Sequence, residues 1–169
     1  MTLDTLQEFI AAIDRIGELV RIQEPVRTRL EIAEIADRCM KSPGGGPALL
    51  FERPLLEDGR PSDYPVAINL YGSMRRMCLA LGVTQLDEIG ARISELLNLK
   101  VPDGFLGKLS LLPRLAEVSK FPPRTRGGRG ACQEIVWQGD QIDLDRIPFL
   151  TTWPGDGGRY ITLPMVITE

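Results

Sequence analysis

The sequence contains no histidine among its 169 residues. Catalytic Ser-His-Asp and Cys-His arrangements use an imidazole as the general base, so both are excluded within this chain. Histidine is also the commonest ligand of transition metals, and a metal bound here would need carboxylate and carbonyl oxygens instead. The missing imidazole therefore narrows both the nucleophilic and the metal chemistry open to the chain.

Cysteine is scarce as well, with only Cys39, Cys78 and Cys132. They are odd in number and far apart, so neither a disulfide framework nor a Cys-x-x-Cys metal pair is expected. Cys39 and Cys78 fall on apolar helix faces and are predicted to be buried thiols. No run reaches the ~20 apolar residues of a membrane span. Acidic residues interrupt the N-terminal apolar residues, so no signal peptide is predicted and we expect a cytoplasmic protein.

Charge is nearly balanced but unevenly distributed. The net charge is −3, with 25 % charged and 43 % hydrophobic residues, a composition typical of globular proteins that argues against general nucleic-acid binding. Residues 1–99 carry 11 basic and 15 acidic groups, residues 100–130 carry 7 and 2, and residues 131–169 carry 2 and 6. The basic middle part is interpreted as a solvated linker, with a phosphate-facing or docking segment as the alternative.

The first hundred residues alternate between helical and strand patterns. A helix is predicted from about Leu3, capped by Asp4 with Gln7 and ended at Gly17, and it is followed by a strand over 18–22. The clearest helix begins at a Thr28-x-x-Glu31 capping box. Its apolar stripe consists of Ile32, Ile35, Ala36, Cys39 and Met40.

Two further strands and two further helices complete this half of the chain. Strands are predicted over 48–51 and 66–70, a helix between Gly72-Ser73 and Gly82, and another from Thr84 with Asp87. The mixture predicts an α/β (α+β) domain over residues 1–120. The glycine-rich stretch 42–47 follows a helix and precedes a strand, the reverse of a phosphate-binding loop. A helix stop and turn is the favoured interpretation, and phosphate binding is the alternative.

The last third of the chain has a different pattern. Residues 121–130 are rich in arginine and glycine and are predicted to form a linker. Extended segments are predicted over 132–137, 142–147 and 160–168, with Pro164 favouring an edge strand or a bulge. Residues 131–169 are therefore predicted to begin a β-rich domain that is incomplete, because so few strands bury little surface.

Four stretches together resemble a known family. They read LEIAEIADRCMKSPGGGPALLF at 30–51, AINLYGSMRR at 67–76, RGACQ at 129–133 and DLDRIPFLTTWPGDGGRYIT at 143–162. In order and spacing they are similar to the N-terminal part of UbiD-type decarboxylases. The resemblance implies that the β-rich segment begins the split β-barrel that holds prenylated FMN, together with Mn²⁺ and K⁺, in that family.

The site residues that the resemblance brings to this chain are few. Thr162 occupies the position nearest the flavin pocket and is the one predicted cofactor-binding residue. Trp153, Pro154 and Asp156 match the loop before it, for which a structural role is predicted. The family's catalytic Glu-Arg-Glu network and its metal-binding Asn, His and Glu lie beyond the matching positions. We therefore predict no catalytic residue and no metal ligand here, and no cofactor bound by this fragment alone.

The resemblance implies loss of CO2 from an aromatic or α,β-unsaturated acid, such as a polyprenyl-hydroxybenzoate or a menaquinone-pathway acid of quinone biosynthesis. The wording from Asp156 to Pro164 is slightly closer to the menaquinone-pathway members. A flavin prenyltransferase would supply the cofactor, and the enzyme would be a homo-oligomer. Two alternatives stay open: a non-catalytic subunit that docks on a separate catalytic chain, and an independent small flavoprotein.

Overall fold

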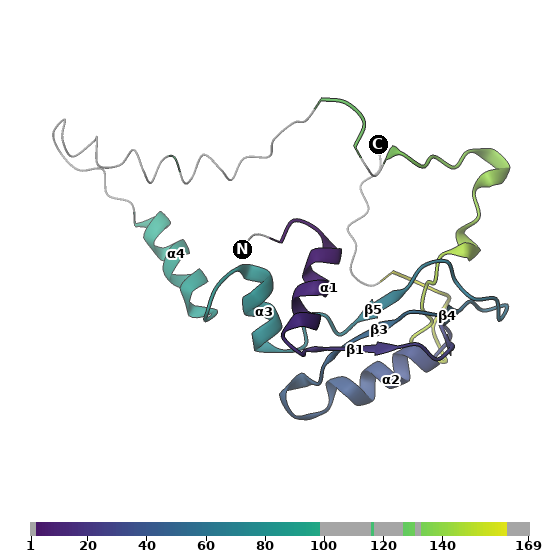
Figure 1. The fold of residues 1–169 in the computed structure, drawn as a ribbon, viewed down its shortest axis with the longest axis horizontal. Coiled ribbons are helices and arrows are strands. Elements are labelled where there is room, and N and C mark those ends of the chain that lie inside the picture. The colour runs from purple at the N-terminus through teal and green to yellow at the C-terminus, as the bar shows by residue number, and fades with distance from the viewer. Residues whose placement is uncertain (1–2, 99–115, 117–126, 131–132, 162–169) are drawn as a thin grey trace. The chain divides into compact units, whose positions relative to one another are not determined.

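The computed structural model describes residues 3–98, 116, 127–130 and 133–161. The chain divides into two units, one made of residues 1–86 and 143–169 and the other of residues 87–142. The first unit holds nearly all of the regular structure (Figure 1). Of the second unit, the described elements are helix α4 (Asp87–Leu97) and the 3-10 turn η3 (Gly139–Gln141). None of the helices in the described residues is long and apolar enough to cross a membrane.

A three-stranded sheet forms the centre of the first unit. Strand β3 (Ala48–Phe51) lies between β1 (Leu19–Ile22), which is parallel to it, and β5 (Val66–Ile68), which is antiparallel. All four residues of β3 are buried, because helices cover both faces of the sheet. Its continuous apolar run Ala-Leu-Leu-Phe is the pattern that a central strand needs.

Helices pack on the two faces of this sheet (Figure 1). On one face α1 (Leu6–Arg15) and α3 (Met74–Leu81) lie over a cluster centred on Phe9, Ile13 and Ala48. On the other face α2 (Glu31–Met40) buries Ile32 and Ala36 against Leu49 and Phe51. The first unit is therefore a helix–sheet–helix sandwich, which confirms the predicted mixture of helices and strands.

The predicted helix starts were partly wrong. Helix α1 is capped by Thr5, whose capping box uses Glu8, rather than by Asp4 with Gln7. Helix α2 begins only at Glu31, and its N-cap residue Leu30 makes no side-chain cap. The predicted box at Thr28 does not form because the backbone of this fully buried residue pairs with neighbouring strands instead.

Thr28 and its neighbours join a small second sheet to the segment around Thr151. Strand β2 (Val26–Arg27) pairs in parallel with β4 (Pro54–Leu55). Beyond β2, the Thr28 amide donates to the Leu55 carbonyl at 2.9 Å, and the Thr151 amide donates to the Thr28 carbonyl at 3.3 Å. The Leu30 amide in turn donates to the Thr151 carbonyl at 2.9 Å. This bond holds Leu30 at φ 67°, a conformation that costs a non-glycine residue about 1–3 kcal/mol.

Residues 143–161 thus pack on the first unit, with Leu150 in the core beside Ile32 and Phe51. The strands predicted over 132–137 and 142–147 were wrong for the residues that the structure describes. Residues 133–137 form no strand, the 3-10 turn η3 follows them, and the 3-10 turn η4 (Leu144–Arg146) lies within 142–147. The pairing of the segment is limited to isolated bridges further on, at Leu150 and Thr151. Most of the strand predicted over 160–168 lies outside the described residues. Alternating apolar residues favoured strands here, but strand pairing needs a partner edge that this segment finds only briefly.

Replacement of Leu150 by Ala tests whether the 143–161 segment contributes to the stability of the first unit. We expect the free energy of unfolding to fall by about 2–3 kcal/mol, the lower part of the range for core leucines, because Leu150 is 9 % exposed. The matched control is Leu144→Ala, which changes an exposed leucine of the same segment and should cost less than about 0.5 kcal/mol. Urea unfolding followed by circular dichroism measures both. Equal effects would show that the segment does not pack as described.

Candidate functional site

A buried arginine joins three segments of the first unit. Arg76, on α3, is 0 % exposed, and its Nη1 donates to Glu18 Oε2 at 2.6 Å. Its Nη2 donates to the carbonyls of Gly46 at 2.9 Å and Asn69 at 3.2 Å, and its Nε donates to the Leu70 carbonyl at 3.2 Å. A buried charge is tolerated only when it is paired and its donors are satisfied, and both conditions hold here.

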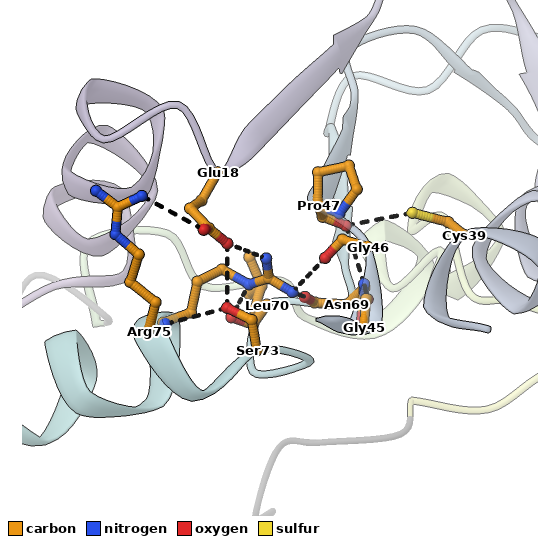
Figure 2. Close-up of polar contacts among 10 residues, drawn as sticks. Glu18, Cys39, Gly45, Gly46, Pro47, Asn69, Leu70, Ser73 and Arg75 are labelled. Atoms are coloured by element: carbon orange, nitrogen blue, oxygen red, sulfur yellow. Dashed lines mark hydrogen bonds and ion pairs between the residues drawn. The ribbon is translucent and has the colours of Figure 1, made fainter. Parts of the chain in front are cut away.

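Glu18 accepts from more than one group at the start of β1. Ser73 Oγ donates to Glu18 Oε2 at 3.1 Å and accepts from the Arg76 amide at 3.2 Å, so it also caps α3. The guanidinium of Arg75 lies 3.6 Å from Glu18 Oε1, but its side chain is 62 % exposed. Two adjacent arginines therefore meet one carboxylate, one from inside the fold and one from its surface (Figure 2).

The glycine-rich turn packs against this cluster through its backbone. A Cβ on Gly45 would lie 1.8 Å from the Gly72 carbonyl oxygen, and one on Gly46 would lie 2.2 Å from the Cys39 carbonyl oxygen. Asn69 Nδ2 donates to the carbonyls of Gly45 at 2.8 Å and Pro47 at 2.9 Å. The glycines are thus required for close approach and for positive φ, which confirms the predicted helix stop and turn.

These contacts do not fit a phosphate. A phosphate cradle presents backbone N–H groups, whereas this turn directs its carbonyls at Arg76, Asn69 and the Cys39 thiol. In the described part of the chain every buried side-chain nitrogen and oxygen has a hydrogen-bond partner. The glycine-rich turn therefore does not present the donors that a flavin phosphate needs.

A second polar cluster lies in the loop from Thr152 to Tyr160. The Asp156 Oδ2 accepts from the amides of Thr152 at 3.1 Å and Trp153 at 2.8 Å, and from the Tyr160 hydroxyl at 2.5 Å. The Thr152 hydroxyl also donates to this oxygen at 3.0 Å. Four donors on one carboxylate oxygen fix the loop, which supports the structural role predicted for Asp156.

The same contacts shift two pKa values. Hydrogen bonds from the Tyr160 hydroxyl, and then from the amides and the Thr152 hydroxyl, lower the pKa of Asp156 because they stabilise its charged form. The hydrogen bond to Asp156 raises the pKa of Tyr160, since the phenol would lose that bond on ionisation. The loop therefore carries its charge on Asp156 and keeps Tyr160 neutral over the physiological range.

A shallow hollow of about 250 Å³ lies between α1 and α3. It is lined mainly by Leu3, Leu6, Phe9 and Tyr71, and the rings of Phe9 and Tyr71 stack with centroids 5.5 Å apart. Its volume is below the range of about 300–1,000 Å³ typical of ligand pockets. Asp4, Thr5 and Ala80 complete its lining, and the Thr5 hydroxyl is already used in the capping box of α1. We therefore assign the hollow to the packing around α1 rather than to a binding site.

The predicted site residues have different outcomes. Thr162, the predicted cofactor-binding residue, lies outside the described residues, so its role stays a prediction. Arg76, the centre of the buried cluster, was missed, since an arginine beside Arg75 on a short helix reads as a solvated face. The sequence feature that could have indicated this cluster is the family motif at 67–76. Its residues Asn69, Gly72, Ser73 and Arg76 lie together in the cluster.

Comparison with protein families then identifies the chain. The family model described as the 3-octaprenyl-4-hydroxybenzoate carboxy-lyase N-terminal domain matches residues 10–93. The model described as the Rift-related domain of the same carboxy-lyase matches residues 124–169. This chain belongs to the UbiD family. The four stretches that carried the resemblance all fall within or across these two matches, so the predicted family is confirmed.

Relatives in other organisms are much longer than this UbiD-family chain. An uncharacterized protein of Aquifex aeolicus is 46 % identical over 164 residues, which is 97 % of this chain and 32 % of the relative. An uncharacterized protein of Archaeoglobus fulgidus is 41 % identical over 169 residues, which is 100 % of this chain and 32 % of the relative. The chain thus spans about a third of the length of the curated relatives that it matches.

A solved structure shares the fold of the UbiD-family chain. The vanillic acid decarboxylase of Sedimentibacter hydroxybenzoicus, in its closed form, matches with a TM-score of 0.66 and 24 % sequence identity. The match covers 95 % of this chain and 30 % of the decarboxylase chain. The mixed α/β architecture is therefore that of a UbiD-type decarboxylase.

Two adjacent arginines offer a direct test of the buried cluster. We expect Arg76→Met to lower the free energy of unfolding by about 3 kcal/mol or more, because it leaves Glu18 without its buried partner. The control, Arg75→Met, removes an exposed cation from the same carboxylate and should cost less than about 1 kcal/mol. Thermal and urea unfolding measure both changes. Similar losses of unfolding free energy from the two substitutions would contradict the assignment of Arg76 as the residue that holds the cluster together.

The Asp156 cluster predicts an acid transition confined to the loop. A carboxyl with a lowered folded-state pKa stabilises the loop above its ordinary pKa of about 3.9. That contribution is lost as the pH falls through the lower folded-state value. We expect the ¹⁹F signal of 5-fluorotryptophan at Trp153 to move over this acidic range. The transition should be absent in Asp156→Asn and retained in Asp140→Asn, and a transition retained without Asp156 would assign it to another group.

Proposed function

We propose that this chain is the N-terminal part of a non-oxidative decarboxylase that removes CO2 from an aromatic or α,β-unsaturated acid. The observation that carries the proposal is the presence of two carboxy-lyase family domains in sequence, at residues 10–93 and 124–169. The substrate would be of the polyprenyl-hydroxybenzoate or menaquinone-pathway type. The vanillic acid decarboxylase named above supports an aromatic acid as the substrate class.

The cofactor of the whole enzyme would be prenylated FMN, with Mn²⁺ and K⁺, supplied by a flavin prenyltransferase. This part of the proposal rests on the family, since the glycine-rich turn presents carbonyls rather than the N–H donors that a flavin phosphate needs. Bound in the whole enzyme, the flavin would supply the reactive centre, while the protein binds and orients the acid. We place the cofactor contacts at and beyond Thr162, where the Rift-related domain would continue as a split β-barrel.

The role proposed for residues 1–161 is structural: they support the Rift-related domain that would bind the flavin. The buried Arg76 cluster holds the helices and the sheet of the sandwich together. The pairing of Thr28 and Leu30 with Thr151 attaches the segment that precedes the flavin domain to this sandwich. On this account the chain alone has no decarboxylase activity, and the active form is a homo-oligomer of the longer protein. A non-catalytic subunit that docks on a separate catalytic chain is the second candidate.

The test compares the chain alone with the chain joined to the remaining two thirds of the Aquifex aeolicus relative. Each is produced together with a flavin prenyltransferase, and CO2 release is measured on a polyprenyl-hydroxybenzoate, a menaquinone-pathway acid, 4-hydroxybenzoate, vanillate and cinnamate. We expect the joined chain to bind the flavin and release CO2, and the chain alone to do neither. Activity only when the two pieces are supplied as separate chains would favour the subunit alternative. A joined chain that binds the flavin and releases no CO2 from any of these acids would contradict the proposed reaction.

A further inference from the structure

The loop from Thr152 to Tyr160 presents a large apolar side chain to solvent from a rigid support. Trp153 is 64 % exposed, although tryptophan is the side chain with most to gain from burial. Its own amide is held by Asp156 at 2.8 Å, so the loop cannot readily fold the indole back onto the protein. The exposure of Trp153 is therefore a consequence of the hydrogen bonds that shape the loop.

The base of the loop is fixed as firmly as its tip. Leu150 lies in the core, and the Tyr160 amide donates to the Leu150 carbonyl at 3.1 Å, which closes the loop. Arg159 pairs with Asp145 in the preceding segment. A surface whose backbone is already ordered loses little conformational entropy when a partner covers it, and such preorganisation favours binding.

Exposed apolar side chains continue beyond the indole. Tyr160 is 41 % exposed and Ile161 is 52 % exposed, so the loop and the first residue after it carry three exposed apolar side chains. A rigid aromatic flanked by smaller apolar groups is the composition of an interface anchor, because tryptophan and tyrosine are enriched among the residues that dominate binding energy. Single exposed apolar residues are ordinary, so what distinguishes Trp153 is that its amide is fixed by Asp156.

We propose that Trp153 is the anchor of a docking surface formed by Trp153, Tyr160 and Ile161, and that its occupant is the polypeptide that completes the Rift-related domain. The family model for that domain covers residues 124–169, and the relatives extend over about three times the length of this chain. The missing part of a β-rich domain would present the apolar faces of strands to this surface. The inference rests on the proposed function in taking the chain as part of a longer enzyme, but not on its reaction or cofactor.

The experiment uses the remaining two thirds of the Aquifex aeolicus relative, produced as a separate polypeptide, as the probe. The chain carries 5-fluorotryptophan, and the Trp153 signal is assigned by its loss in Trp153→Phe. We expect the probe to shift this ¹⁹F signal and to remove its sensitivity to solvent. Trp153→Ala should raise the Kd about thirty-fold, which corresponds to the ~2 kcal/mol of an anchor residue.

Two further variants separate the anchor from general surface effects. Met74→Ala removes an apolar residue of similar exposure, 65 %, on α3 and should leave the Kd unchanged. Asp156→Asn keeps the indole but loosens its support, so it should weaken binding by several-fold. Equal effects of Trp153→Ala and Met74→Ala would overturn the proposal, as would binding that leaves the Trp153 signal unchanged.

If the separate probe does not fold, a second measurement tests the proposal. In one polypeptide that joins this chain to the same remainder, Trp153 should be protected from solvent and from acrylamide. An indole that stays as accessible as in the chain alone would overturn the proposal. A Trp153 signal that shifts when the chain alone is concentrated would identify a second copy as the occupant and overturn it as well. None of these readings uses flavin or substrate, so they do not depend on the decarboxylation assay.

Discussion

The ion pair between Arg76 and Glu18 is the interaction on which the rest of the first unit depends. It joins α3 to the start of β1, and the same guanidinium holds the glycine turn before β3 and the segment after β5. These pieces lie up to 58 residues apart in the sequence. Arg76 donates to three backbone carbonyls besides Glu18, so one side chain satisfies several backbone groups at once. Its burial makes the geometry of the turn, and therefore of the central strand, specific.

A second set of contacts attaches residues 143–161 to this sandwich. Thr28 and Leu30 pair with Thr151, and Leu150 enters the core. The residues of the family motifs are thus mostly those that close the fold: Gly45, Gly46, Asn69 and Arg76 meet in one cluster, while Leu30 and Thr151 meet in the other. The chemistry of the whole enzyme is proposed to lie beyond these motifs.

Local signals in the sequence predicted the helices of the sandwich and its three main strands, because apolar periodicity and glycine stops act over a few residues. Contacts over long distances in the sequence decided the rest. The sequence predicts Thr28 as a helix cap, but its backbone hydrogen-bonds to Leu55 and Thr151 instead. The sequence also predicts Arg76 as a surface residue, but its side chain is fully buried. The alternating residues before Leu150 predicted strands that need partner edges absent from the described residues. The predicted role of Thr162 depends on the family alone and stays a prediction.

The most direct test of this account is a double-mutant cycle on Glu18 and Arg76. Glu18→Ala, Arg76→Ala and the double variant are unfolded in urea, and the coupling free energy is obtained from the three changes in stability. Since Glu18 is the carboxylate that pairs with the fully buried guanidinium of Arg76, we predict that the double variant is little less stable than Arg76→Ala, with a coupling of about 1–3 kcal/mol. Strictly additive losses, with a coupling near zero, would show that the two residues act independently and would contradict the central role of the pair.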